Sequence, residues 1–227
     1  MVSAEPVSAA ILLAAGTSSR MGAGRHKLLL PLAGRPLVQY SVEAILASQA
    51  RPLVIVLGHR AEEVRTALGE YASHPAVELV INPAYAQGMS TSLRCGVQAL
   101  LARAARLHEP PPASALILLG DQPFISAGLI NRLITAWRSS GSQIVAPSYG
   151  GRRGNPVLFA SALFPELLNV EGDEGGRRVI ERHRAELMLV EVEAEEARAS
   201  FDVDTWEAYQ EALRAQLDPE MPGHQGL

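Results

Sequence analysis

The chain has little cysteine, no long apolar run and no excess of positive charge. Cys95 is the only cysteine among 227 residues, which excludes an intramolecular disulfide framework and a metal site built from several cysteines. The net charge of −4 argues against a general nucleic-acid binder, which carries a basic excess or stripe. No stretch reaches the ~18–20 apolar residues of a membrane span, and the apolar run near the N-terminus is too short for a signal peptide. We therefore expect a cytoplasmic protein that binds neither nucleic acid nor membrane.

Two common phosphate-binding motifs are also missing. The P-loop pattern G-x-x-x-x-G-K-[ST] fails because Lys27 is followed by Leu28, so no hydroxyl group stands ready for Mg²⁺. The dinucleotide fingerprint G-x-G-x-x-G fails because residues 22–27 read GAGRHK. The six histidines show no metal-ligand spacing. Any phosphate site in this chain must therefore be built from another kind of loop.

The composition is that of a globular protein with a substantial core, with 48% hydrophobic and 19% charged residues. Short apolar runs rich in Val, Ile and Leu predict strands, and amphipathic runs between them predict helices. The strands are expected at 8–14, 52–58, 77–81, 115–119 and 143–146, and the helices at 36–48, 60–69, 90–105 and 126–139, the last capped by Ser126. This alternation predicts an α/β fold, a doubly wound and mostly parallel sheet with helices on both faces.

The second half of the chain is less regular. An apolar run covers 157–160, helices are expected at 160–168, 177–184 and 205–217, and a strand at 186–192. We find no linker or repeat and expect a single domain over 1–217. Residues 218–227 carry two prolines, two glycines and few apolar residues, so a disordered tail is expected there.

The strongest functional signal is the loop 13–27, LAAGTSSRMGAGRHK, which directly follows an apolar strand. Small residues let backbone N–H groups approach phosphate oxygens, and Arg20 and Lys27 add two cations. Ligands of open α/β sheets bind at such strand ends, so the loop indicates a triphosphate. The alternative is that Gly16 and Gly22 serve only as turn glycines and that Arg20 is a solvated charge.

Asp121 is the second signal, at the end of the predicted strand in LLGDQPF. Pro123 stops simple continuation of the strand, which leaves a carboxylate at the same edge of the sheet as the 13–27 loop. Mg²⁺ is commonly held by one or two carboxylates together with substrate phosphates, so Asp121 is a candidate ligand. The alternative is a carboxylate that starts a turn or caps the helix 126–139.

Two further segments carry polar candidates. Residues 81–96 lead from a strand into a helix, and Ser90 or Thr91 is a possible cap for that helix. The helix start also suits an anion or the donors that a base or ribose needs. In FDVDTW, Asp202 and Asp204 share a face if the segment is a strand. Asp202 is the better ligand candidate, because Asp204 or Thr205 can instead cap the last helix.

Together these residues resemble the MobA-like nucleotidyltransferases, and within them most closely the molybdenum cofactor cytidylyltransferases. The resemblance covers roughly residues 8–215 and rests on five ordered motifs: LAAG-x(3)-RMG-x(4)-K at 13–27, GDQPF at 120–124, GNP at 154–156, GDEGGR at 172–177 and DVDT at 202–205. It implies a fold of the nucleotide-diphospho-sugar transferase type. One departure from the family pattern is Arg178, because residues 176–178 read Gly-Arg-Arg where Gly-Ala-Arg is expected in that loop. The departure concerns the identity of the substrate and not the reaction class.

The resemblance also implies roles for individual residues. The nucleotide contacts are Leu13, Ala14, Ala15, Gly16, Arg20, Lys27, Asn82, Gly88, Ser90 and Ser92. The acceptor contacts are Asn155, Pro156, Asp173, Gly175 and Arg177. Arg20, Lys27 and Asp121 are the catalytic residues, and Asp121 and Asp202 hold Mg²⁺.

The function implied is Mg²⁺-dependent transfer of CMP from CTP to the terminal phosphate of a molybdopterin-type cofactor, with release of pyrophosphate. The pair Ala14-Ala15 resembles the cytidylyl enzymes, whereas guanylyl enzymes carry Gly-Gly there. A molybdoenzyme is an expected recipient of the product. Three alternatives stay open: a guanylyltransferase, a sugar-phosphate nucleotidylyltransferase, and a non-catalytic chaperone that binds the molybdenum cofactor.

Overall fold

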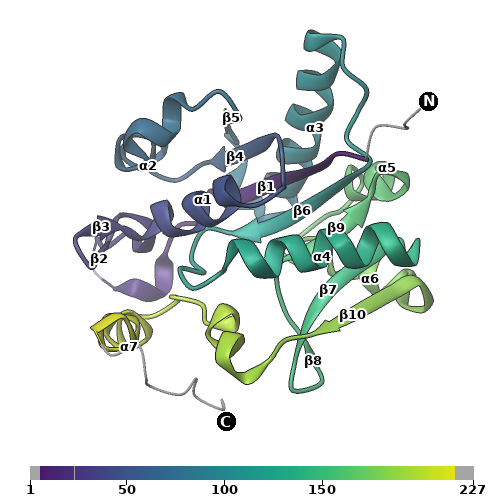
Figure 1. Ribbon diagram of the computed structural model, residues 1–227. Coiled ribbons are helices and arrows are strands. Elements are labelled where there is room, and N and C mark those ends of the chain that lie inside the picture. The colour runs from purple at the N-terminus through teal and green to yellow at the C-terminus, as the bar shows by residue number, and fades with distance from the viewer. Residues whose placement is uncertain (1–5, 23, 218–227) are drawn as a thin grey trace.

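A central sheet with the strand order β10–β7–β9–β6–β1–β4–β5 organises the computed structural model, which describes residues 6–22 and 24–217 (Figure 1). The strands are β1 (Ser8–Ala14), β4 (Leu53–Leu57), β5 (Val77–Ile81), β6 (Ser114–Leu119), β7 (Ile144–Tyr149), β9 (Val157–Ala160) and β10 (Leu187–Glu191). The short β8 (Arg152–Arg153) pairs with β7, and β2 (Pro31–Leu32) pairs with β3 (Arg35–Pro36) as a separate ribbon.

The sheet is mostly parallel, as the sequence predicts. β1 pairs in parallel with β4 and β6, β4 with β5, and β7 with β10. There are two exceptions among the described strands: the short β8 is antiparallel to β7, and β9 lies between β6 and β7 and runs antiparallel to both. The four residues of β9 are all buried. A short, fully apolar run of this kind does not indicate whether the strand pairs in parallel or antiparallel.

Helices cover both faces of the sheet and enclose two cores (Figure 1). One core joins α1 (Leu37–Ala47), α2 (Ala61–Ala67), α4 (Ala127–Ser140) and α7 (Trp206–Leu217) to the sheet. The other joins α3 (Met89–Leu107), α5 (Phe164–Leu167) and α6 (Arg177–Arg182) to the opposite face. This arrangement confirms the predicted α/β fold. No helix among the described residues has the length and apolar character needed to cross a membrane.

Close packing fixes the central strands against α3. Ile11 of β1 lies so near Gly96 that a Cβ atom at Gly96 would collide with the Ile11 side chain. At the other end of β1, the backbone N–H of Gly120 donates to the carbonyl of Leu13 at 3.0 Å. This bond keeps β1 and β6 in register up to their carboxyl ends, where the loops 13–27 and 120–124 begin.

Several element ends differ from the sequence-based expectations. α3 begins at Met89 with Gly88 as its first flanking residue, so neither Ser90 nor Thr91 caps it. The segment 201–204 has no strand structure. Thr205 caps α7, because its Oγ1 accepts from the Ala208 N–H at 3.1 Å. Ser126 caps α4 as predicted, accepting from the Leu129 N–H at 3.0 Å. Residues 218–227 lie outside the described part of the chain, and the single domain over 1–217 stays a prediction.

Candidate active site

A cavity of about 580 Å³ opens at the carboxyl ends of β1 and β6. Its walls come from five parts of the chain: the loop after β1, residues 85–89 with Ser92 at the start of α3, the Gly120-Asp121 turn, Asp173, and the segment 202–204. The predicted residues that line it are Leu13, Ala14, Ala15, Gly16, Arg20, Lys27, Gly88, Ser92, Asp121, Asp173 and Asp202. The fold thus brings most of the expected nucleotide and metal residues to one cavity, at the place where open α/β sheets bind ligands.

The loop after β1 turns its small side chains inward. Ala14 belongs to one core and Ala15 to the other, and both are buried. Ala15 packs directly on Gly58, where an added Cβ would lie 2.7 Å from the Ala15 Cβ atom. A larger residue at 15 would therefore push the loop away from β4. With these two side chains buried, this part of the loop offers a ligand its backbone, and the polar residues that follow, among them Thr17, Ser19 and Arg20, also line the cavity.

Ser18 closes the loop and sets the position of Lys27. It has a φ of 57°, in the left-handed region, which is uncommon for a residue with a Cβ atom. Its Oγ accepts from the backbone N–H of Lys27 at 3.1 Å. The two ends of the loop are thereby joined, and the side chain of Lys27 is directed into the cavity that it lines.

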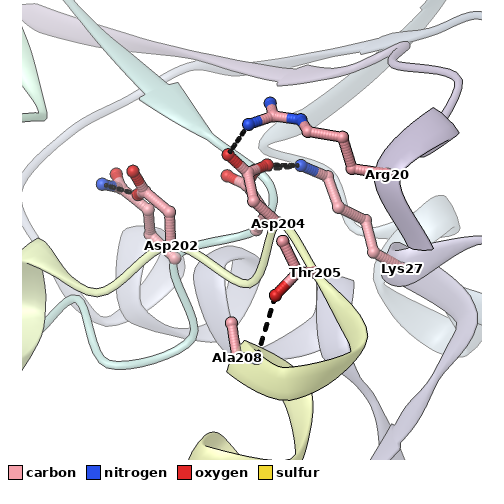
Figure 2. A network of polar contacts seen from close by, with 8 residues as sticks. Arg20, Lys27, Asp202, Asp204, Thr205 and Ala208 are labelled. Atoms are coloured by element: carbon pink, nitrogen blue, oxygen red, sulfur yellow. Dashed lines mark hydrogen bonds and ion pairs between the residues drawn. The ribbon is translucent and has the colours of Figure 1, made fainter.

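Lys27 joins the carboxylates of two distant segments. Its Nζ donates to Asp121 Oδ2 and, at 2.7 Å, to Asp204 Oδ1. Arg20 Nη1 lies 3.0 Å from the second oxygen of Asp204, and Figure 2 shows both cations converging on this residue. Burial alone lowers the pKa of Lys27, but the contacts with Asp121 and Asp204 outweigh it and raise that pKa above its usual value. The lysine is therefore held charged.

Asp202 lies beside this network without joining it (Figure 2). Its Oδ1 accepts from the side-chain amide of Gln122 at 2.7 Å. Burial, and after it the charge of Asp121, raises the pKa of Asp202 to about 6. Removing a carboxylate from water and placing it near another disfavours its ionised form. A cation between Asp121 and Asp202 would relieve both effects.

The carboxylates fit a divalent metal that shares its coordination with a substrate. Asp121 Oδ1 is buried and has no hydrogen-bond partner, although buried polar atoms are nearly always paired. Among the described residues no three His, Cys, Asp or Glu side chains form a group able to hold a metal by themselves. Mg²⁺ is usually bound by one or two carboxylates together with phosphates and water. The residues present match that pattern, with phosphate oxygens completing the site.

Asn82 and Ser90, two of the predicted nucleotide contacts, lie outside the lining of this cavity. The Asn82 amide donates to Thr91 Oγ1 at 2.8 Å and to Ser92 Oγ at 3.0 Å, and its carbonyl oxygen accepts from the Ala84 N–H. Ser90 is fully buried, and its hydroxyl donates to the Glu171 carbonyl at 3.0 Å. Both residues hold the wall of the site in place.

Asp173 caps α3 from a position far along the chain. Its Oδ1 accepts from the Met89 N–H at 2.9 Å, and the neighbouring Gly172 carbonyl accepts from the Ser90 N–H at 3.2 Å. A Cβ atom at Gly88 would lie 2.6 Å from that carbonyl oxygen. Two loops predicted to serve different substrates, 82–92 and 172–177, are thus packed directly against each other.

A second cavity, of about 220 Å³, adjoins the first and shares Leu13, Met89 and Leu119 with it. The predicted acceptor residues Asn155, Gly175 and Arg177 line this cavity. Pro156 is buried beside it and Asp173 lines the first cavity instead. The predicted acceptor set therefore surrounds the border between the two cavities.

Several residues that line these cavities are absent from the predicted set, and three of them matter for the chemistry of the site: Asp204, Met89 and Arg153. Asp204 was considered both as a site carboxylate beside Asp202 and as a helix cap and was left out of the predicted ligands, yet it receives both Lys27 and Arg20. The repeat of aspartate at every second position in FDVD was the available signal for it. Met89 and Arg153 line the second cavity, and nothing in their local sequence marks them.

His26, near the end of the 13–27 loop, stacks on His59. The rings of His26 and His59 are 5.5 Å apart between centroids and 13° from parallel. Both ring nitrogens of His26 are buried without a hydrogen-bond partner. Burial, followed by the nearby His59 and Arg60, lowers the pKa of His26 to about 4. His26 is therefore a neutral packing residue at neutral pH.

The fold and the site define a nucleotidyltransferase-type protein. The model of the MobA-like NTP transferase domain matches residues 10–187, and the chain belongs to this family. The structure is similar to that of a homologue of Mycobacterium tuberculosis Rv0371c from Mycobacterium sp. strain JC1, with a TM-score of 0.76 and 28% identity over 94% of this chain and 98% of that one. It is also similar to a nucleotidyl transferase from Methanothermobacter, Mth528, with a TM-score of 0.75 and 26% identity over 96% and 100% of the two chains.

Sequence relatives cover the chain to different extents. The bifunctional protein GlmU of Pelobacter propionicus is 33% identical over 182 residues, which are 78% of this chain and 34% of that protein. The chain thus spans about a third of the length of that relative. The purine catabolism protein PucB of Bacillus subtilis is 28% identical over 211 residues, 92% of this chain and 98% of that protein.

Proposed function

We propose that this nucleotidyltransferase transfers CMP from CTP to the terminal phosphate of a molybdopterin-type acceptor and releases pyrophosphate. The observation that carries the proposal is the pair of adjoining cavities at the carboxyl ends of β1 and β6. The first combines a small-residue loop with the cations of Arg20 and Lys27 and the grouped carboxylates of Asp121, Asp202 and Asp204. These are the groups that a triphosphate and a metal ion require. The second has a largely apolar lining that suits the ring system of the acceptor.

The chemistry assigned to the site is an in-line attack of the acceptor phosphate oxygen on the α-phosphorus of CTP. The new P–O bond replaces the bond to the β-phosphate oxygen, and pyrophosphate leaves with that electron pair. The attacking phosphate is already anionic, so the step needs no strong general base. Catalysis then comes from positioning and from neutralising charge at phosphorus.

Lys27 and Arg20 supply that neutralisation. Lys27 is held charged at the centre of the site, and its ammonium group is assigned to the α-phosphate. Arg20 is largely exposed at the cavity edge, and its guanidinium is assigned to the departing pyrophosphate. Asp204 orients both cations through the contacts described above.

Asp121 and Asp202 are the residues that would hold Mg²⁺. The unpaired buried oxygen of Asp121 and the neighbouring carboxylate of Asp202 support this assignment. When bound, the ion supplies positive charge to the phosphate oxygens. The Gln122 amide keeps Asp202 oriented toward the cavity.

The preference for CTP rests on the resemblance of Ala14-Ala15-Gly16 to the cytidylyl enzymes. The structure adds a physical reason for small residues here. Ala15 packs on Gly58, and the Cβ atom of Tyr85 lies equally close to Gly58, so there is no room for a larger side chain. A guanylyltransferase and a sugar-phosphate nucleotidylyltransferase would share the nucleotide half of the site. A molybdenum cofactor chaperone without catalysis would have no use for Lys27 and Asp121 in one network. A cytoplasmic location and a molybdoenzyme as recipient belong to the same proposal.

The deciding experiment is a pyrophosphate-release screen. CTP, GTP, ATP and UTP are each offered with molybdenum cofactor and with simple sugar 1-phosphates, in the presence of Mg²⁺. We expect the fastest release with CTP and molybdenum cofactor, and release near background for Asp121→Asn. Faster release with GTP, or with a sugar phosphate, would replace the proposed substrate. Binding of molybdenum cofactor without pyrophosphate release would favour the chaperone.

A further inference from the structure

The second cavity has an apolar floor and a charged rim. Its floor is formed by aliphatic and aromatic side chains, among them Leu93, Ile117, Val157 and Phe159. These residues offer no hydrogen-bonding groups from their side chains to a ligand lying on them. A polyhydroxylated sugar would leave its hydroxyl groups unpaired there, which is costly. A planar heterocycle loses little on such a surface and gains apolar contact.

Arg153 stands at the rim on a rigid support. It belongs to β8, opposite Ser148 of β7. The next residue, Gly154, donates its N–H to the Pro147 carbonyl at 2.9 Å and lies so close to the Tyr149 ring that a Cβ atom would collide with it. Tyr149 in turn donates its hydroxyl to the Asn155 carbonyl at 3.2 Å. The backbone on both sides of Arg153 is therefore held in place.

The charge on Arg153 is not balanced by a close partner. No hydrogen bond or ion pair within the described part of the chain engages its guanidinium group, whereas Arg177 pairs with Glu181 at 3.0 Å and Arg178 pairs with Glu174 at 2.6 Å. Partial burial and then the nearby positive charge of Arg177 lower the pKa of Arg153, and the carboxylate of Glu181 offsets part of that change. Because Glu181 is engaged by Arg177 and not by Arg153, an anion bound to Arg153 would balance a charge that has no close partner among the described residues.

We propose that Arg153, together with Arg177, binds a second anionic group of the acceptor, carried by a planar heterocycle and distinct from the phosphate that attacks CTP. The inference rests on the proposed function in that it assigns this cavity to the acceptor. The planar fork of a guanidinium matches a carboxylate-like or oxyanionic group through two parallel hydrogen bonds. Arg153 is thus a specificity residue, whereas Lys27 and Arg20 serve the reacting phosphates.

Binding of two fluorescent probes tests the inference without turnover. Pterin-6-carboxylate has a planar heterocycle with an anionic group, and pterin lacks that group. Dissociation constants are measured by fluorescence titration for wild-type protein and for Arg153→Gln, Arg153→Lys and Arg152→Gln. Arg152 is the matched control, because it is the neighbouring arginine in β8 and does not line the cavity.

Wild-type protein is expected to bind pterin-6-carboxylate about tenfold more tightly than pterin, since a charge-assisted hydrogen bond has that value. Arg153→Gln removes the difference, Arg153→Lys restores part of it, and Arg152→Gln leaves it unchanged. Equal binding of the two probes, no binding of either, or an equal loss in the Arg152 variant would overturn the inference.

Turnover separates this inference from the proposed function. With molybdenum cofactor as acceptor, Arg153→Gln should raise the KM for the acceptor about tenfold and leave kcat and the KM for CTP unchanged. A fall in kcat alone would contradict a binding role. If no nucleotide is turned over at all, the proposed function fails, while the probe measurements still decide what Arg153 binds.

Discussion

The ammonium group of Lys27 lies between Asp121 and Asp204, two carboxylates that are 83 residues apart in the chain, because it donates to both. In this position the lysine neutralises the carboxylate that is proposed to bind the metal. Lys27 donates to Oδ2 of Asp121, so a metal ion on the unpaired Oδ1 would share one carboxylate with the ammonium group and be repelled by it. We infer that metal and triphosphate enter together, with the phosphates drawing Lys27 away from Asp121.

Removing the lysine should therefore have opposite effects on metal binding and on catalysis. In Lys27→Met, we expect Mn²⁺ to bind the nucleotide-free protein several-fold more tightly, because no ammonium competes for Asp121. Turnover should fall by about 10²–10³, as for loss of one preorganised charge at a transition state. Electron paramagnetic resonance of free Mn²⁺ gives the affinity. Arg20→Met is the control: within the described residues the carboxylate that Arg20 pairs with is Asp204 and not Asp121, so its loss should change Mn²⁺ affinity much less.

The three aspartates should divide into two classes. Asp121→Asn and Asp202→Asn are expected to weaken Mn²⁺ binding in the presence of CTP by tenfold or more, because each removes a charged oxygen ligand. Asp204→Asn should leave Mn²⁺ affinity within about twofold and raise the KM for CTP, since Arg20 and Lys27 lose the carboxylate that orients them. A larger loss of Mn²⁺ in Asp204→Asn than in Asp202→Asn would reverse the assignment of the second ligand.

Two glycines at the contact between loops 82–92 and 172–177 offer a matched pair. Gly88 has a φ of +110°, and its added Cβ would lie 2.6 Å from the Gly172 carbonyl oxygen. Gly172 has a φ of +72° with nothing within 4 Å of its added Cβ. We expect Gly88→Ala to lower the free energy of unfolding by about 3 kcal/mol and Gly172→Ala by about 1 kcal/mol, measured by urea denaturation. Equal losses of unfolding free energy would show that the cost comes from the positive φ of each glycine and not from the collision at Gly88.

His26 should make the protein less stable in mild acid. Its folded-state pKa of about 4 is below the usual 6.5. Between these two pH values the imidazole binds a proton in the unfolded chain and stays neutral in the folded chain. Stability is complete above pH 6.5 and falls as the pH drops toward 4, by at most about 1.4 kcal/mol per pH unit for one proton. His26→Phe keeps a ring against His59 and removes the unpaired nitrogens. We expect equal or greater stability at pH 7 and a shallower loss between pH 6.5 and 4. An unchanged acid profile in this variant would refute the role of His26.

Local patterns allowed most elements to be predicted, because their signals lie within each segment. The apolar runs at 8–14 and 77–81 coincide with β1 and β5, and the cap at Ser126 was visible from its own residue type. The pairing direction of β9 could not be predicted, since four buried apolar residues carry no information about their partner strands. Pairing direction is set by distant chain, which a local pattern does not contain.

The residues of the site also divide into those with a local sequence signal and those positioned by distant parts of the chain. Arg20, Lys27 and Asp121 could be predicted because a loop and a turn at strand ends must meet at one edge of the sheet, and all three line the cavity. The cap of α3 could not, because Asp173 reaches Met89 from 84 residues further along the chain. Ser90 looked like a cap from its type and position, yet tertiary packing buries it against the carbonyl of Glu171.

Leu13 and Met89 belong to both cavities. A molecule in which nucleotide and acceptor are joined covers these two residues and both cavities at once, so it makes contacts that neither substrate makes alone. Linked ligands are held more tightly than their separate halves. We therefore expect the finished dinucleotide to leave slowly and to limit the rate of turnover. An enzyme that docks over the cavities and takes the product directly would then set the turnover rate of this protein.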